Sequence, residues 1–273
     1  MSFISSNLTT LFDDVNTKVG TIATEIGKTP QTWNSSIFSM IENLSNNVMV
    51  PIAGIIITFV LCYELITMVT EKNNMHDFDT FMFFRFFFKA AVAVYLVSNT
   101  FTITMAVFDL AQHVITQSGN LITDSTSVDI QATITTMQTE MKTMEIGGLL
   151  QLAVETLIIS LCLKIMSILI TVILYGRMIE IYLTVSIAPI PFATMSNREW
   201  GHIGTNYFKS LFALGFQGFF MMVIVAIYAV FVNNLTVASD IHSALFSVGA
   251  YTVLLCFALM KTGSLSKALF GTH

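Results

Sequence analysis

Charged residues are scarce in this chain: Asp, Glu, Lys and Arg together make up only 11% of its 273 residues. An ordinary soluble domain carries roughly 25%, and so few charges cannot cover the surface of a water-soluble fold. Hydrophobic residues make up 54% of the chain, and its mean hydropathy is +0.75. The composition therefore argues against a soluble protein and indicates one that lies in a membrane.

Basic residues are also few, and the formal net charge is −5. Surfaces that coat nucleic acid are basic, so the charge argues against that class of protein. The three cysteines lie in apolar segments and lack the spacing of a disulfide framework or a metal site, so we interpret them as buried hydrophobic residues. They are Cys62, Cys162 and Cys256.

Motifs of catalysis and of metal binding are missing. The sequence has no Gly-x-Ser-x-Gly elbow, no phosphate-binding Walker loop and no His-Glu-x-x-His motif, and its five histidines are scattered. We therefore predict that the protein is not an enzyme and holds neither a metal nor a cofactor.

Long apolar segments are what the chain does contain. One bilayer crossing needs about 20 apolar residues as a helix. Five segments meet this requirement, and we predict an all-α, polytopic membrane protein with about five transmembrane helices in a domain over residues 47–262. The predicted spans are 47–70, 86–109, 146–175 with an extension to 195, 211–232 and 241–260.

Two regions outside these spans are polar. In residues 1–46 apolar side chains recur at helical spacing, which predicts an amphipathic helix lying on the membrane or on a partner, or else a solvated leader helix. Residues 110–145 are expected to form a loop, with a helical segment over 128–142. Residues 263–273 form a short tail.

Lys and Arg gather in alternate connections, which predicts the orientation by the positive-inside rule. The first connection, the region around Arg198 and the tail are rich in basic residues, whereas 110–145 has one and 233–240 has none. We therefore expect the N-terminus and 110–145 outside, and the tail in the cytosol. This arrangement needs one crossing in the third apolar block, and hence five in total.

Ionisable groups inside a span are costly, and they mark functional sites by default. Glu155 and Lys164 lie in the third span, nine residues apart, and therefore face opposite sides of one helix. Each needs a partner on another helix, in another subunit or in water. We take both as candidates for a lumen or a subunit seam. The alternative is a shallow position with the side chain reaching the headgroups.

Three other features suggest packing or anchoring. Six phenylalanines within residues 81–88 flank Arg85; they fit membrane anchors better than stacking on single-stranded DNA. Arg177 and Glu180 stand three residues apart and are expected to pair. Gly215 and Gly218 are candidates for close helix packing.

The segment from Arg177 onward carries a resemblance to a known family. Its most specific parts are Ala188-Pro189-Ile190-Pro191, Asn197-Arg198-Glu199 and Tyr207-Phe208-Lys209-Ser210. It resembles the TrbL-type, or VirB-six-type, polytopic channel subunit of type IV secretion systems, most of all the versions on conjugative elements of Gram-positive bacteria. The close match covers roughly 146–260, and the first 46 residues match poorly.

The resemblance implies a function that composition and spacing do not show. Such proteins lie in the cytoplasmic membrane and help form the path or the platform for exported DNA or protein, while ATPases of the same machine supply the energy. It also implies a homo-oligomer, as a ring of about five copies, with other secretion subunits as partners. We expect an inner-face collar, where an ATPase or coupling protein docks, formed by Arg177, Glu180, Pro189, Pro191, Arg198, Glu199 and Lys209.

Two other classes of function stay open. A small-solute transporter or ion channel is one, although the sequence shows no internal repeat of the kind that many transporters have. A scaffold for assembly of a membrane complex, without a pore, is the other.

Overall fold

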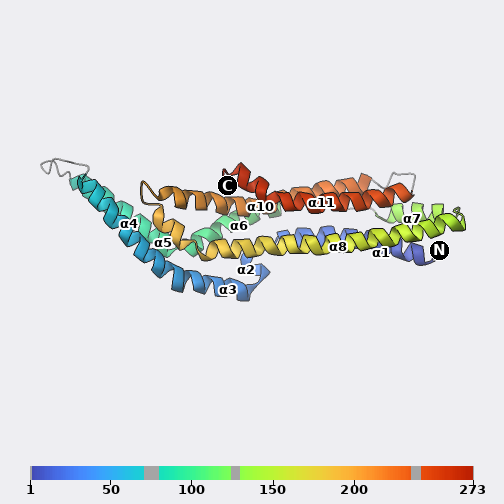
Figure 1. The fold of residues 1–273 in the computed structure, drawn as a ribbon, viewed down its shortest axis with the longest axis horizontal. Helices are drawn as coiled ribbons and strands as arrows, with labels where there is room; N and C mark the ends of the chain where they lie inside the picture. The colour runs from blue at the N-terminus through green and yellow to red at the C-terminus, as the bar shows by residue number, and fades with distance from the viewer. Residues whose placement is uncertain (1, 71–79, 124–129, 235–240, 273) are drawn as a thin grey trace. The chain divides into compact units, whose positions relative to one another are not determined.

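The computed structural model describes residues 2–70, 80–123, 130–234 and 241–272, and within these ranges every regular element is a helix (Figure 1). Five helical segments of the described residues are long and apolar enough to cross a membrane. They are Ser35–Thr70, Phe81–Ser98, Ile146–Ser186, Gly201–Asn234 and Ile241–Leu269. The prediction of an all-α polytopic membrane protein with about five spans is thereby confirmed.

The helices are named in chain order. The elements are α1 (Ser2–Ile26), α2 (Pro30–Trp33), α3 (Ser35–Leu44), the π-helical turn η1 (Ser45–Met49), α4 (Val50–Thr70), α5 (Thr80–Ser98), α6 (Thr100–Thr123), α7 (Ile130–Met141), α8 (Ile146–Ser186), α9 (Pro189–Thr194), α10 (Gly201–Asn234) and α11 (Ile241–Leu269).

The chain divides into two compact units. Unit 1 comprises Met1–Lys28, Gln112–Arg177 and Gln217–Leu265. Unit 2 comprises Thr29–Ala111, Met178–Phe216 and Ser266–His273. Each unit has its own cluster of buried hydrophobic residues, so each is described separately.

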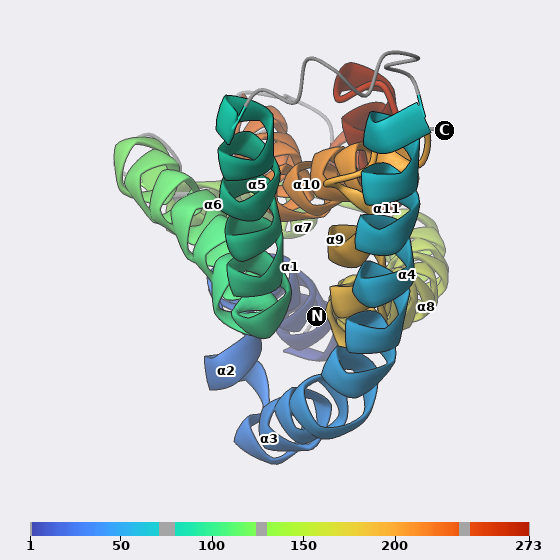
Figure 2. The same ribbon diagram turned by 90° about the vertical axis from the view of Figure 1, so that its left-hand side faces the viewer.

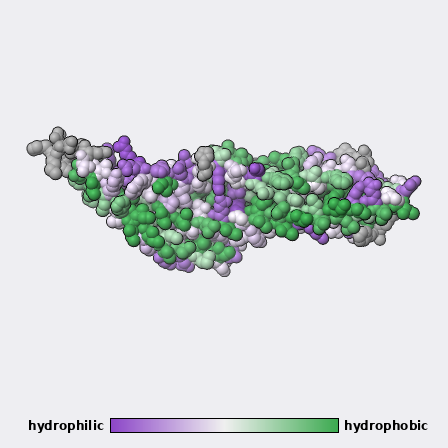
Figure 3. Space-filling model, viewed as in Figure 1, coloured by the Kyte–Doolittle hydropathy of each residue, from purple (hydrophilic) through white to green (hydrophobic). Residues whose placement is uncertain are grey.

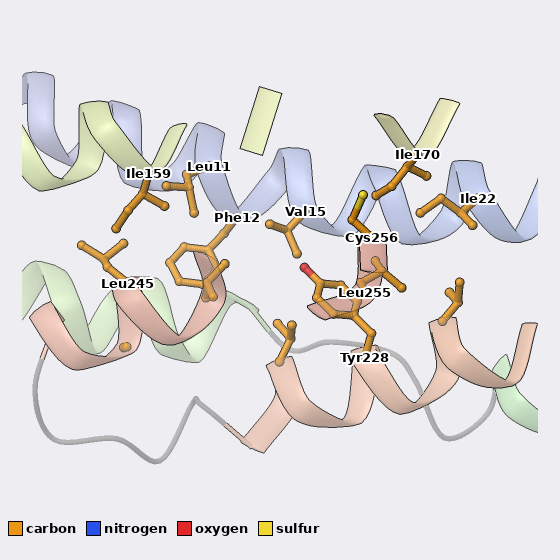
Figure 4. Packing of buried hydrophobic residues seen from close by; sticks show 14 of the residues in the cluster. Leu11, Phe12, Val15, Ile22, Ile159, Ile170, Tyr228, Leu245, Leu255 and Cys256 are labelled. Atoms are coloured by element: carbon orange, nitrogen blue, oxygen red, sulfur yellow. The ribbon is translucent and has the colours of Figure 1, made fainter. Parts of the chain in front are cut away.

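In unit 1 the amphipathic N-terminal helix is part of the core. The apolar stripe of α1, including Leu11, Phe12 and Val15, is buried among side chains of α8, α10 and α11 (Figure 4). Ile22 and Ile26 continue the stripe and are 1% and 0% exposed. The helix itself is as predicted. Its apolar face, however, is covered by the protein's own chain, and not by a membrane, a partner or water.

In unit 2 the short helix α9 packs against both α4 and α5, which also contact each other (Figure 2). Five of its six residues are buried, among them Pro189 and Pro191. The preceding α8 ends at Ser186, because Pro189 cannot donate a backbone hydrogen bond and its ring clashes with the carbonyl four residues earlier. The expected extension to residue 195 is therefore a separate helix.

The helix expected over 86–109 is two helices that meet at Asn99, α5 and α6. The side chains at this junction bond to the backbone: the Asn99 amide donates to the carbonyl of Tyr95 at 2.9 Å, and the Thr100 hydroxyl lies 2.8 Å from the carbonyl of Val97. Such local bonds compete with regular helix.

The polar region 110–145 is mostly helical where the structure describes it. Helix α6 continues to Thr123, and α7 covers Ile130–Met141, close to the helical segment expected over 128–142. The part of this expected loop at 124–129 lies outside the described residues.

Candidate functional site

Glu155, a charge inside a predicted span, has its partner on another helix of unit 1. The Nδ1–H of His242, at the start of α11, donates to Oε2 of Glu155 on α8. The amide of Gln151, one turn earlier, donates to Oε1 at 2.8 Å. Because the Glu155 side chain is only 14% exposed, these bonds replace much of the water that the carboxylate would otherwise need.

Lys164 lies elsewhere on α8 and lines a cavity of about 290 Å³ in unit 1. One wall is the polar face of α1, which carries Asp14, Thr17, Lys18 and Thr21. Ser167 of α8 lies on the same cavity, whose apolar wall includes Leu163, Ile170, Tyr228 and Leu255. We call Asp14, Thr17, Lys18, Thr21, Lys164 and Ser167 the polar strip.

Most of the remaining α8 surface is apolar. Large hydrophobic side chains are exposed along its whole length, and hydrophobic residues cover much of the face seen in Figure 3. An apolar surface of this extent needs lipid or another protein surface to cover it. Those on α8 that are more than half exposed are Ile146, Leu150, Val154, Leu157, Ile158, Leu161, Ile168, Val172, Ile179 and Leu183.

The expected pair between Arg177 and Glu180 is not formed. Arg177 is 7% exposed and packs beside Gly218 in unit 1, and its Nε has no hydrogen-bond partner among the described residues. Glu180 instead accepts from Nζ of Lys267 at 2.7 Å in unit 2. Spacing along one helix could not reveal Lys267, which lies at the end of α11.

Two further residues of the expected collar, Arg198 and Glu199, lie on a second cavity, of about 610 Å³ in unit 2. It is formed by the end of α4, the start of α5 and the connection between α9 and α10. Charged side chains from all three parts line it: Glu64, Arg85, Lys89, Arg198 and Glu199.

Hydrogen bonds fix both carboxylates of this cavity. Nζ of Lys89 lies 2.6 Å from Oε1 of Glu64, and the hydroxyl of Tyr63 donates to Glu199 at 3.2 Å. The connection itself is held by Asn197, whose Oδ1 accepts from the backbone N–H of Glu199 and of Trp200. Of the other collar residues, Pro189 and Pro191 are buried in α9, and Lys209 is exposed.

Both glycines expected at helix contacts lie where α10 meets another side chain closely. A Cβ at Gly215 would stand 2.9 Å from the Cβ of Ala111, within unit 2. A Cβ at Gly218 would stand 2.6 Å from Nη2 of Arg177 and from Cδ1 of Ile115, within unit 1. The tightest approach is at Gly204, where a Cβ would be 2.5 Å from the carbonyl oxygen of Pro191 and closer still to Cγ of Met195.

A comparison with protein families decides what kind of membrane protein this is. The model of the TrbL/VirB6 plasmid conjugal transfer-like proteins matches residues 15–189, more than half of the chain. The chain belongs to this family. No curated protein and no solved structure matches it.

The range of this TrbL/VirB6 match differs from the range that carried the resemblance in the sequence. It begins at residue 15, within the region that was expected to match poorly, and it ends at Pro189. It therefore includes α1, which the structure places in the core of unit 1. Glu155, Lys164, Arg177, Glu180 and Pro189 fall inside the match; Pro191, Arg198, Glu199, Lys209, Gly215 and Gly218 fall outside it.

Sequence reasoning missed most partners of the site residues in this TrbL/VirB6-type chain. His242, Lys267 and the polar face of α1 are each more than 80 residues from the group they face. No local pattern marks such contacts. The one usable signal was the helical spacing of polar residues on α1, which showed that its polar and apolar faces are distinct.

Proposed function

We propose that this protein is a channel subunit of a conjugal transfer system, lining the path by which DNA or protein crosses the cytoplasmic membrane. The observation that carries the proposal is the TrbL/VirB6 family match over residues 15–189. Five apolar helices make the chain a multi-pass membrane protein, as a channel subunit requires.

The polar strip supports a water-filled path. Two of its members, Lys164 and Ser167, lie on α8, which exposes a long row of large apolar side chains. A surface with Asp14, Lys18 and Lys164 is poorly matched to hydrocarbon, because charged and hydrogen-bonding groups there lose their water. Facing an aqueous lumen or a subunit seam satisfies these groups.

The apolar face of α8 supports assembly into a homo-oligomer. If copies pack through this face, or through lipid held against it, the polar strips of all copies can turn toward a common axis. A ring of about five copies, as the family resemblance implies, is the arrangement we propose. Each copy in such a ring has a net charge of −5. This negative charge suits the passage of a DNA strand, which must keep moving and not bind tightly.

The exposed charges of unit 2 support a docking surface. Lys209 and Glu199 are exposed, and we propose that they belong to an inner-face collar that receives an ATPase or a coupling protein. Pro189 and Pro191 are buried in α9 of the same unit; their part is to hold the collar's backbone and not to touch the partner. Arg177 is buried in unit 1, and we leave it out of the docking surface.

Cysteine labelling tests the lumen. The native cysteines are first replaced by serine, since Cys62 is exposed and would react by itself. Single cysteines are then placed on the polar strip at Thr17, Thr21 and Ser167, and matched controls at Ile158 and Ile168 on the apolar face of α8. The labelling is done in cells that contain the assembled machine. We expect a membrane-impermeant thiol reagent to label the cysteines on the polar strip at least about tenfold faster than the control cysteines.

The outcomes separate the classes of function. Labelling of the strip that also blocks DNA transfer supports a conduit. Labelling that leaves transfer unchanged points to the scaffold without a pore. Equal, low reactivity of strip and control positions would remove the aqueous path altogether.

A further inference from the structure

The cavity of unit 2 has the features of an anion site. Three cationic side chains and two carboxylates line it, which leaves one net positive charge. Lys89 is held by Glu64, and Glu199 accepts from Tyr63. Arg85 and Arg198 have no carboxylate partner among the described residues. Their guanidinium groups are therefore the groups available to an anion.

The position of the cavity points to lipid as the source of that anion. Its lining comes from the last turns of α4 and the first turns of α5, which are ends of two candidate membrane spans. Next to Arg85 on α5, large aromatic side chains are exposed: Phe81, Phe84, Phe87 and Phe88. Aromatic side chains beside arginine at the end of a span are typical of the headgroup level of a bilayer.

A second aromatic group borders the cavity from the α9–α10 connection. Trp200 stacks on Phe59 with ring centroids 5.8 Å apart, and on Tyr63 at the same distance. The Tyr63 ring thus joins the stack, while its hydroxyl reaches Glu199 in the cavity. The amphipathic rings of Trp and Tyr are enriched at this depth of a membrane.

We propose that this cavity binds the phosphate group of an anionic phospholipid, held by Arg85 and Arg198. Arginine suits the task because its planar guanidinium donates two parallel hydrogen bonds to a phosphate. A volume of about 610 Å³ falls in the range of roughly 300–1,000 Å³ that small-molecule sites have. A single phosphodiester of charge −1 balances the net charge of the lining. Basic pockets between spans are general lipid headgroup sites.

Lipid retention on the purified full-length chain tests this site. The protein in detergent is stripped of lipid, mixed with phosphatidylglycerol or phosphatidylcholine, and weighed intact by native mass spectrometry. We expect selective retention of phosphatidylglycerol. The double variant Arg85→Gln/Arg198→Gln should retain at most about one tenth of the phosphatidylglycerol that the wild type retains, because a charge-assisted bond is lost at each position. The matched control, Lys142→Gln/Lys261→Gln, removes two exposed charges of unit 1 and should retain phosphatidylglycerol like the wild type.

Competition identifies the source of the phosphate. Excess inorganic phosphate or a single-stranded oligonucleotide should leave phosphatidylglycerol bound. Displacement by either one, equal retention of phosphatidylcholine, or equal retention by the two double variants would overturn the proposal. An unchanged helical circular dichroism spectrum shows that the arginine variant is folded. The readout is lipid mass, so it does not depend on whether the protein forms a conduit.

Discussion

At Gly204 the first turn of α10 comes closer to α9 than any residue with a side chain allows. A Cβ there would lie 2.5 Å from the carbonyl oxygen of Pro191, a backbone atom, and would also meet Cγ of Met195. Five of the six residues of α9 are themselves buried, so its backbone cannot simply move aside. We therefore expect Gly204→Ala to destabilise the protein by about 1–3 kcal/mol, as overpacking does.

The control for this substitution is Gly54→Ala on α4, also in unit 2, where an added Cβ meets nothing within 4 Å. In an open helix interior, alanine is favoured over glycine by up to about 1 kcal/mol. Thermal unfolding in detergent, followed by circular dichroism, should give a lower midpoint for Gly204→Ala and an equal or higher one for Gly54→Ala. Equal midpoints would mean that α9 and α10 are not packed as described.

The bond between His242 and Glu155 joins α11 to α8 where both side chains are largely shielded, at 27% and 14% exposed. We expect a double-mutant cycle with His242→Ala and Glu155→Gln to give a coupling free energy of about 0.5–3 kcal/mol. The more exposed pair of Lys267 and Glu180, at 44% and 43%, serves as the comparison, because surface pairs contribute about 0–1 kcal/mol. Denaturant unfolding measures both cycles. A smaller coupling for His242 and Glu155 than for the surface pair would contradict the geometry.

Among the elements, α8 is far longer than one crossing needs. Its 41 residues reach about 61 Å at 1.5 Å per residue, whereas the hydrocarbon core is about 30 Å thick. Only part of α8 can therefore lie in hydrocarbon at any time. The sequence predicts the crossing at 146–175.

Arginine substitutions along one face of α8 can locate that part. Leu150, Leu161, Val172 and Leu183 recur every eleven residues, point in nearly the same direction, and are all exposed. Arginine at the centre of a crossing costs about 2.5–3.5 kcal/mol of insertion free energy. We expect Leu161→Arg to lower the amount of protein in the membrane fraction most, and Leu183→Arg to be tolerated. If all four variants accumulate equally in membranes, α8 does not cross in hydrocarbon.

How far the elements could be predicted depends on whether local or distant residues decide them. Runs of apolar residues are local, so the five candidate spans and the helical segment near 128–142 were found. The break at Asn99 was missed, because hydropathy alone does not register side-chain bonds to the backbone. What covers the apolar stripe of α1 was also missed, because its neighbours come from α8, α10 and α11.

The same distinction holds for the candidate site. Glu155 and Lys164 were singled out by a local fact, a charge in an apolar segment. Their surroundings follow from tertiary packing. His242 bonds to Glu155, and the polar face of α1 lies across the cavity from Lys164. The expected pair of Arg177 and Glu180 failed for this reason, since Lys267 at the end of α11 takes the carboxylate.

For the whole molecule, the number of crossings fixes the relation between the two ends of the chain. We predict that each of the five candidate spans crosses once; five crossings, an odd number, place the ends on opposite sides of the membrane. The distribution of basic residues predicts which side each end takes: Lys261 and Lys267 lie near the C-terminal end, whereas 110–145 contains only Lys142. This predicts that the tail is cytosolic and that the connection between α7 and α8 is outside.

Alkaline phosphatase fusions test this orientation, because the enzyme is active only after export. We expect activity for a fusion after Lys142 or after Asn234, and none for a fusion after Ser196 or at the tail. The two active and two inactive positions alternate along α8, α10 and α11, so each serves as the control for the next. A sixth crossing inside α8 would reverse the results at Ser196, Asn234 and the tail, but not at Lys142. An inverted molecule would reverse all four results.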